Sequence, residues 1–133
     1  MAISELTGTS KQTIITGNDN VVIVDVFQEV RGGRTLDVSG FTKPVINAGH
    51  LVIMETATKE YKPMPLAASG TDYAALPAGH EYAGVVIQSK ETKDPRVGIL
   101  LRGTVNYKAA PYDMTSILDD VKEVLNLIKF VED

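Results

Sequence analysis

The chain contains no cysteine among its 133 residues. This absence excludes a disulfide framework, a thiolate nucleophile and a cysteine-based metal site, and it is compatible with folding in a reducing cytosol. Long apolar runs are missing as well, since none approaches the roughly 18 residues that a membrane-spanning helix requires. Residues 1–6 lack the basic start and the apolar core of a secretory signal. We therefore expect a soluble chain with no membrane partner.

An excess of basic residues is also lacking, because 13 lysines and arginines stand against 17 aspartates and glutamates. From Asp113 onward, six acids outnumber two lysines by four, which equals the net charge of −4, so residues 1–112 are balanced. Non-specific nucleic-acid binding depends on lysine and arginine neutralising phosphates. We therefore predict no nucleic-acid partner, and we interpret the acids as the solvated face of a helix.

What the chain does contain is short runs of β-branched and apolar residues. The strongest run covers 21–27, and two others, 78–88 and 97–106, each carry an internal glycine and lie just after a proline. A glycine inside a strand lets the strand kink or lets another backbone come close. The pattern predicts a small closed or strongly bent β-structure.

Turn-forming residues separate these runs. Segments 17–20 and 31–34 predict turns, while 13–16 and 35–38 predict short strands. The segment 59–65 contains two closely spaced prolines, so we expect an exposed extended loop there.

One amphipathic helix is predicted over 114–127, with Asp113 or Thr115 able to cap its start. Residues 128–131 alternate and predict a final strand. The apolar stripe of the helix consists of Ile117, Leu118, Val121, Val124, Leu125 and Ile128. The expected fold class is mainly β (α+β), a small compact β-barrel or β-sandwich-like domain with one C-terminal amphipathic helix.

The tripeptide Ala-Gly-His occurs twice, at 48–50 and 78–80, each time directly before an apolar strand. If the two corners met in space, the two histidines could bind a metal with Glu55 or Glu81 as a third ligand. Nothing in the spacing recommends either glutamate, so we favour structural histidines in two similar turns. We assign no catalytic, cofactor-binding or metal residues and expect no cofactor.

Other catalytic patterns are weaker still. Ser69-Gly70 reads as a flexible turn rather than a nucleophile elbow, and 8–11 lacks the leading glycine and preceding strand of a phosphate loop. The tyrosines favour the core edge or an interface over ligand stacking. Arg102 interrupts an apolar run, and we favour an outward-facing strand position over a pair across a subunit contact. These tyrosines are Tyr61, Tyr73, Tyr82, Tyr107 and Tyr112.

The order of the segments resembles a known family. Val-Ile-Asn-Ala-Gly-His-Leu-Val at 45–52 precedes a proline-bearing loop, and Leu-Pro-Ala-Gly-His-Glu-Tyr-Ala-Gly-Val-Val follows at 76–86. Next come Val-Gly-Ile-Leu-Leu-Arg-Gly-Thr-Val-Asn at 97–106 and, after the helix, Leu-Ile-Lys-Phe at 127–130. Over residues 40–133 this order is similar to the head decoration and head fibre proteins of tailed bacteriophages, lambda decoration-protein-like in the broad sense.

The resemblance implies a non-enzymatic structural virion protein that binds the outer surface of an assembled capsid and stabilises it. Its implied partners are the major capsid protein and further copies of itself, often as a homotrimer, on a virion assembled in the bacterial host cytoplasm. Residues 40–133 would form the decoration-like β domain, and residues 1–39 an N-terminal arm and β-hairpin segment within that domain or added to it. Residues 13–15 or 21–26 could provide an edge strand for docking.

Three alternatives remain open at this point. The chain could be a small β-barrel that binds a sugar or peptide, with tyrosines and histidines lining its mouth. It could be a metal-dependent enzyme that uses His50 and His80. It could also be another virion component, such as a neck or tail protein.

Overall fold

The computed structural model describes residues 17–132. The arm expected over 1–12 and the short strand expected over 13–16 lie outside the described residues. The elements are α1 (Asp19–Val22), β1 (Ile23–Glu29), β2 (Arg34–Thr35), β3 (Val45–Ile46), β4 (Leu51–Glu55), β5 (Tyr61–Pro63), β6 (His80–Val86), β7 (Lys90–Glu91), β8 (Arg96–Val97), β9 (Ile99–Asn106), a 3-10 turn (Thr115–Ile117), α2 (Leu118–Val124) and β10 (Ile128–Val131).

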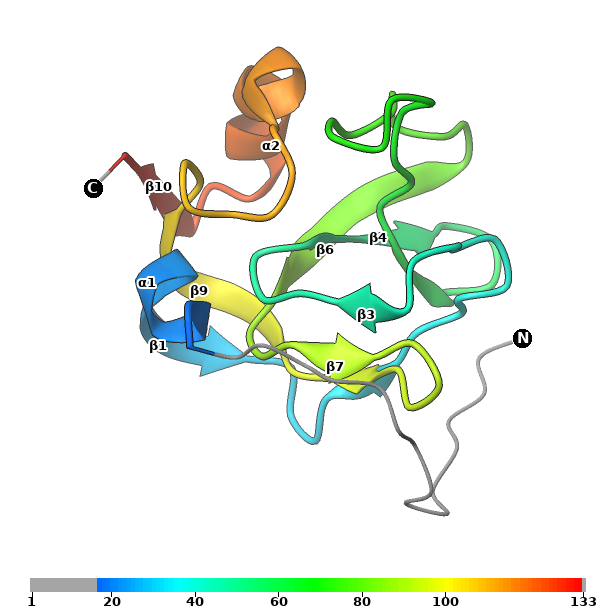
Figure 1. Cartoon of the computed structure of the whole chain (residues 1–133), viewed down its shortest axis with the longest axis horizontal. Helices are drawn as coiled ribbons and strands as arrows, with labels where there is room; N and C mark the ends of the chain where they lie inside the picture. The colour runs from blue at the N-terminus through cyan, green and yellow to red at the C-terminus, as the bar shows by residue number, and fades with distance from the viewer. Residues whose placement is uncertain (1–16, 133) are drawn as a thin grey trace.

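Strands dominate the structure, which confirms the expected mainly β fold with a short C-terminal helix (Figure 1). The main sheet has six strands in the order β1-β9-β6-β4-β5, and β10 is an additional partner of β9. Neighbouring strands are antiparallel except for β10, which runs parallel to β9. Two small sheets, β2-β8 and β3-β7, complete the described fold.

The central strands are buried on both faces. On β4, Leu51 and Ile53 belong to one apolar cluster, whereas Val52 belongs to a second. On β6, Val85 and Val86 divide in the same way. Because successive side chains of a strand point to opposite faces, an uninterrupted apolar run fills two cores at once.

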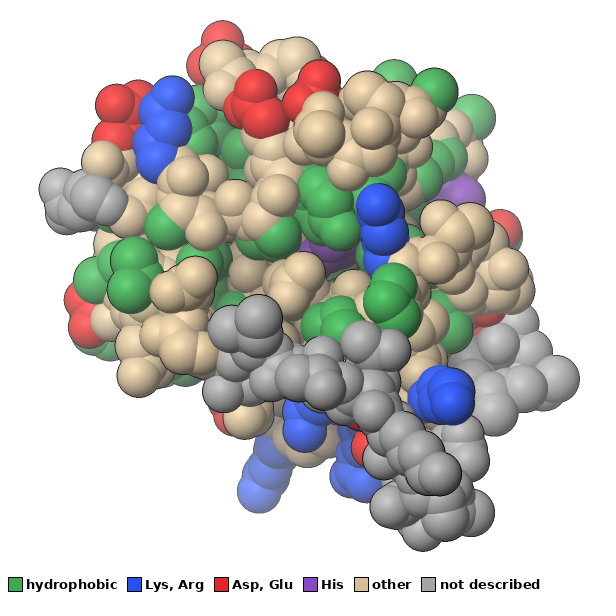
Figure 2. All heavy atoms as spheres, in the orientation of Figure 1, with side chains coloured by type: hydrophobic (Ala, Val, Ile, Leu, Met, Phe, Trp, Pro, Cys, Tyr) green, Lys and Arg blue, Asp and Glu red, His purple; other side chains and the backbone are tan. Residues whose placement is uncertain are grey.

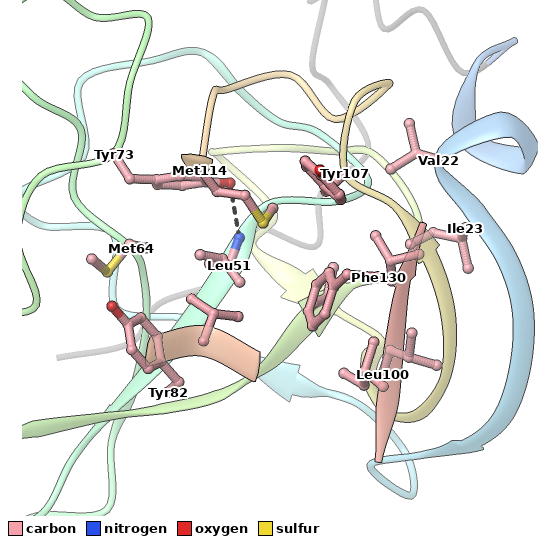
Figure 3. Packing of buried hydrophobic residues seen from close by; sticks show 14 of the residues in the cluster. Val22, Ile23, Leu51, Met64, Tyr73, Tyr82, Leu100, Tyr107, Met114 and Phe130 are labelled. Carbon is pink, nitrogen blue, oxygen red and sulfur yellow. Dashed lines mark hydrogen bonds between the residues drawn. The ribbon is translucent and has the colours of Figure 1, made fainter. Parts of the chain in front are cut away.

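The larger cluster joins both ends of the described chain to the sheet. Val22 and Ile23 enter it from the N-terminal side, and Val121 and Phe130 enter it from α2 and β10. Figure 3 shows Val22, Ile23 and Phe130 within this cluster, and the Leu51 backbone N–H donating to the Tyr73 hydroxyl over 3.0 Å. The residues 23–29 therefore share one hydrogen-bonded sheet and one core with the rest of the fold.

The smaller cluster lies on the opposite face of the main sheet. Ile46 of β3 and Val97 of β8 pack there together with Leu36, and all three are fully buried or nearly so. Ile99 of β9 and Val86 of β6 meet them from the main sheet. The two small sheets thus cover the face that α2 leaves open.

The strand expected over 21–27 begins later than the sequence indicates, because Asp19–Val22 forms the helical turn α1. The Asp19 carboxylate accepts hydrogen bonds from the Ser89 N–H at 2.9 Å and from the Ser89 hydroxyl at 2.8 Å. Val22 packs so closely on Gly49 that a Cβ there would overlap its side chain. These tertiary contacts override the β propensity of the valines.

The loop expected over 59–65 is only partly a loop. Residues Tyr61–Pro63 form β5 against β4, and Pro63 and Met64 are buried rather than exposed. Proline is compatible with this position because β5 is the outer strand of the sheet, where one backbone N–H has no ladder partner.

The C-terminal helix is shorter than the 114–127 expected from its apolar spacing. A 3-10 turn over Thr115–Ile117 leads into α2, which ends at Val124. The Asp113 carboxylate accepts the Thr115 N–H at 2.9 Å just ahead of the 3-10 turn. The expected cap on the helix itself is wrong, because α2 begins after Ile117, far from Asp113, and has no side-chain cap hydrogen bond. The helix stops early because β10 must begin at Ile128, opposite Gly103 of β9. The final strand expected over 128–131 is confirmed.

Gly103 of β9 lies where β1 passes close by. A Cβ at this position would overlap the carbonyl oxygen of Asp25 and lie 3.0 Å from Leu100 Cδ1. We predict that Gly103→Ala lowers the free energy of unfolding by about 1–3 kcal/mol, because β1 must move away from the sheet. Urea denaturation measures the change.

Gly40→Ala is the matched control, since a Cβ at Gly40 meets nothing within 4 Å. We expect this variant to change the free energy of unfolding by less than about 0.5 kcal/mol. Equal effects of the two substitutions would contradict the close packing of β1 on β9.

Candidate docking surface

The two Ala-Gly-His corners are alike in backbone but not in environment. Gly49 and Gly79 both adopt left-handed conformations, with φ of +90° and +75°, which glycine tolerates without the clash that a Cβ introduces. His50 is fully buried, whereas His80 is partly exposed. The shared motif therefore codes for a shared turn into a strand, as expected, and not for two equivalent site residues.

His50 lies inside a box of aromatic rings. Phe41, Tyr73 and Tyr112 each meet it edge to face, at centroid distances of 5.3, 5.3 and 5.4 Å. Its Nε2 is 2.9 Å from the carbonyl oxygen of Met64, while its Nδ1 is buried with no hydrogen-bond partner. Burial lowers the pKa of His50 to about 4, because the charged form would lose its water. The ring is therefore neutral at physiological pH and packs as part of the core.

The structure does not bring the two histidines together. His80 pairs with Glu55 at one end of β4, whereas His50 directly precedes Leu51 at the other end. Glu55 accepts a hydrogen bond from Thr58 and lies 4.0 Å from Lys62, and Glu81 is exposed. Within residues 17–132 no group of three or more metal-ligating side chains gathers.

One hollow is lined by His80, and it is the best match to the ligand-binding mouth of the sugar- or peptide-binding alternative. Its floor is apolar, and Asp37 and Lys62 bring opposite charges to it. Among the described residues, no tyrosine lines it. Tyr73, Tyr82 and Tyr107 are buried in the larger cluster, and Tyr61 and Tyr112 pack at the edges of the two clusters. The apolar floor consists of Phe41, Ile53, Pro63, Pro65 and Pro77.

The remaining sequence candidate in a loop is Ser69. The Ser69 hydroxyl accepts a hydrogen bond from Thr71 at 3.2 Å, and Gly70 has a φ of +75°. Both features are typical of an exposed turn, and no base lies beside the hydroxyl among its described hydrogen-bond partners.

Three strands of the main sheet, β1, β5 and β10, each pair with a single strand in the described fold, and they differ in how open they are. β10 has four residues, two of them buried. β5 has three residues and includes Pro63, which lacks a backbone N–H. β1 has seven residues, six of them exposed, and within the described fold it pairs only with β9. An outer strand of this length offers unpaired N–H and C=O groups to another chain. β1 is therefore the longest and most exposed open edge of the sheet.

β1 also carries exposed apolar side chains. Val24 and Phe27 have no partner residue on β9, because the register shifts at both positions, and they are 46% and 72% exposed. A β-bulge of this kind re-aims the side chain of the extra residue. Phe27 is turned outward, where it lines a shallow hollow with Leu127 and Arg102.

Arg102 stands on an outward-facing position of β9, the placement favoured from the sequence. It is exposed, and it makes no ion pair with a described residue. The sequence analysis did not predict Phe27 and Leu127 as site residues. The available signal was the large aromatic at the end of the 21–27 run, but sequence alone does not show whether such a side chain is buried.

Charge is distributed unevenly over the molecule. Figure 2 shows acidic side chains over α2 at the top and lysine and arginine side chains at the lower end. The acids of α2 are exposed, in agreement with the solvated helix face expected from the sequence. No helix within residues 17–132 is both long and apolar enough to span a membrane.

Comparison of the chain with protein-family models, with curated proteins and with solved structures yields no match.

The buried imidazole predicts how stability depends on pH. Since the pKa of His50 is about 4 in the fold and 6.5 in the unfolded chain, only the unfolded chain gains a proton between these values. Stability is therefore complete above pH 6.5 and falls as the pH drops towards 4, by about 3 kcal/mol in total. Urea denaturation at several pH values in this window measures the slope.

His50→Gln should flatten that slope, because the glutamine amide does not titrate. His80→Gln is the matched control, and we expect it to keep the wild-type slope because its ring is not enclosed. If His50→Gln and the wild type lose stability equally between pH 6.5 and 5, the prediction that His50 is buried in its neutral form is wrong.

Proposed function

We propose that this chain is a non-enzymatic structural protein that binds the outer surface of an assembled bacteriophage capsid and stabilises it. Its partner is the major capsid protein, and it also associates with itself, with a homotrimer as the expected state. The site of action is the outer capsid surface of a virion assembled in the bacterial host cytoplasm. The identity of the capsid partner comes from the resemblance of residues 40–133 to decoration proteins.

The open edge of β1 is the observation that carries the proposal. An exposed strand edge can accept a strand of another protein, and main-chain hydrogen bonds then contribute affinity without a preformed pocket. Natural proteins usually blunt such edges because they promote unwanted pairing. β1 is blunted only in part, by its register shifts and two exposed acids. Val24, Val26 and Phe27 remain exposed on it, which favours a partner over solvent.

The positions of the two histidines, the strongest candidates for acid–base chemistry in the sequence, support a binding role over catalysis. His50 is enclosed by aromatic rings, and His80 lies at the opposite end of β4. General acid–base catalysis requires a titrating group within reach of the substrate, and His50 has no such access. The second apolar core makes the sheet rigid on both faces, as a clamp on a lattice requires.

Stabilisation of a capsid follows from mass action. A protein that binds the expanded lattice more tightly than the unexpanded one shifts the equilibrium towards the expanded state. Identical contacts repeated over the lattice add through multivalency, so that each single contact can be weak.

Co-sedimentation with capsids tests the proposal. We expect saturable binding of the purified chain to expanded heads of the phage that encodes it, at a fixed ratio to the capsid subunit, and weaker binding to unexpanded heads. Absence of binding to both forms rejects the proposal.

Val24→Lys tests the role of the edge, because a lysine on an outer strand must lose water when another strand is added. We predict that it weakens binding to expanded heads by at least about tenfold, equivalent to about 1.4 kcal/mol. Val124→Lys is the matched control: this valine of α2 has a similar exposure, 51% against 46%. Equal loss in both variants would show that charge, and not the edge, weakens the contact.

A further inference from the structure

The outward face of β1, β9 and β10 has a cation, without an ion pair to any described residue, beside two exposed apolar side chains. Arg102 lies in a hollow together with Leu127 and Phe27, which are 61% and 72% exposed. The opposite face of these strands is buried, since Ile128 and Phe130 of β10 enter the larger cluster. Phe27 and Leu127 of the outward face therefore do not belong to the buried core of the fold.

Charges of both signs surround this apolar centre. The register places Thr104 between Lys129 of β10 and Asp25 of β1, so all three stand on the outward face with Arg102. With neighbouring strands about 5 Å apart, the acid and the lysine are separated by about 10 Å across the sheet. Neither Asp25, Arg102 nor Lys129 makes an ion pair with a described residue.

We propose that this face binds a second copy of this chain, with Asp25 of one copy against Arg102 of its neighbour. Phe27 and Leu127 are then covered by the apolar side chains of the neighbour. We name this surface, formed by Asp25, Phe27, Arg102, Thr104, Leu127 and Lys129, the outward β1–β9–β10 face.

Charge complementarity selects a second copy over a different partner. The face already carries both halves of the ion pair, so two copies satisfy each other without any property assumed for another protein. Contacts between identical subunits commonly use such self-complementary patches. Its composition agrees with this role, because aromatic residues and arginine are enriched in the cores of interfaces and among the residues that dominate binding energy.

The outward β1–β9–β10 face leaves the open edge of β1 free. Side chains stand roughly perpendicular to a sheet, whereas its hydrogen bonds lie within it. Self-association through the face and strand addition at the edge therefore use different directions of the same strand. The inference rests on the self-association within the proposed function, but not on capsid binding. A self-complementary face joins two copies about a two-fold axis, so it predicts a dimer where the resemblance to decoration proteins implies a homotrimer.

Sedimentation equilibrium of the purified full chain, from micromolar to near-millimolar concentration, tests the inference. We expect reversible association of the wild type. Phe27→Asp should raise the dissociation constant at least about tenfold, because it places an unpaired charge in the apolar centre. Val21→Asp is the matched control: Val21 is 52% exposed but does not line the hollow, so association should persist.

A charge exchange tests the ion pair separately from the apolar contact. Asp25→Arg and Arg102→Asp should each weaken association, and the double variant should restore most of it because the opposite charges face each other again. Both side chains are exposed, so urea denaturation should show the fold retained. Because the double variant restores the opposite charges both within one copy and across copies, a mixture of the two single variants separates these cases. In that mixture an arginine meets an acid at these positions only across copies, so association of the mixture identifies an interface and not a structural role within the monomer.

Three results would overturn the inference: a monomeric wild type throughout the concentration range, association unchanged in Phe27→Asp, or no rescue by the charge exchange. If the wild type is monomeric and Phe27→Asp abolishes binding to heads, the face belongs to the capsid contact instead. If the chain associates as described but does not bind heads, this inference holds and the capsid proposal fails.

Discussion

The fold depends on β9 and its pairing with three other strands. β6 and β10 share one side of β9, at Ile99–Leu100 and at Gly103–Asn106, while β1 occupies the other side. Two parts of the chain that are distant in sequence, 23–29 and 128–131, are thereby joined to the same eight residues. Gly103 permits this arrangement because only a residue without a Cβ lets β1 approach so closely. The larger core and the outward β1–β9–β10 face are the two sides of this junction.

Burial separates the side chains that hold the fold together from those available to a partner. His50 is a titratable side chain that the fold encloses, surrounded by three rings and a carbonyl oxygen. The low pKa of His50 is a consequence of that packing. At the surface of the described fold, most of the exposed large apolar side chains lie instead on β1 or beside it, and Arg102 and Lys129 line the same hollow as Phe27 and Leu127. This arrangement supports the proposed role in binding another protein.

The repeated Ala-Gly-His motif shows which features of the fold a local sequence pattern can predict. The glycine in each copy was interpretable from sequence, because a strand entry of this type needs a left-handed residue. The histidines were not distinguishable, although one is buried and the other partly exposed. What separates them is antiparallel pairing: β4 and β6 run in opposite directions, so two identical starts lie at opposite ends. A strand-entry motif therefore predicts the turn, but not which residues meet.

The sequence by itself determined the mainly β class, the final strand and the presence of a helix, because these depend on spacing and propensity over a few residues. It also indicated the outward position of Arg102, since strand faces alternate. Only the tertiary structure decided that Asp19–Val22 is helical, that Tyr61–Pro63 is a strand and that α2 ends at Val124. Each of these outcomes depends on a contact with a distant segment, namely Ser89, β4 and β9. The exposure of Phe27 and Leu127 belongs to the same group, because which face of a strand is covered is decided by what packs against it and not by the strand itself.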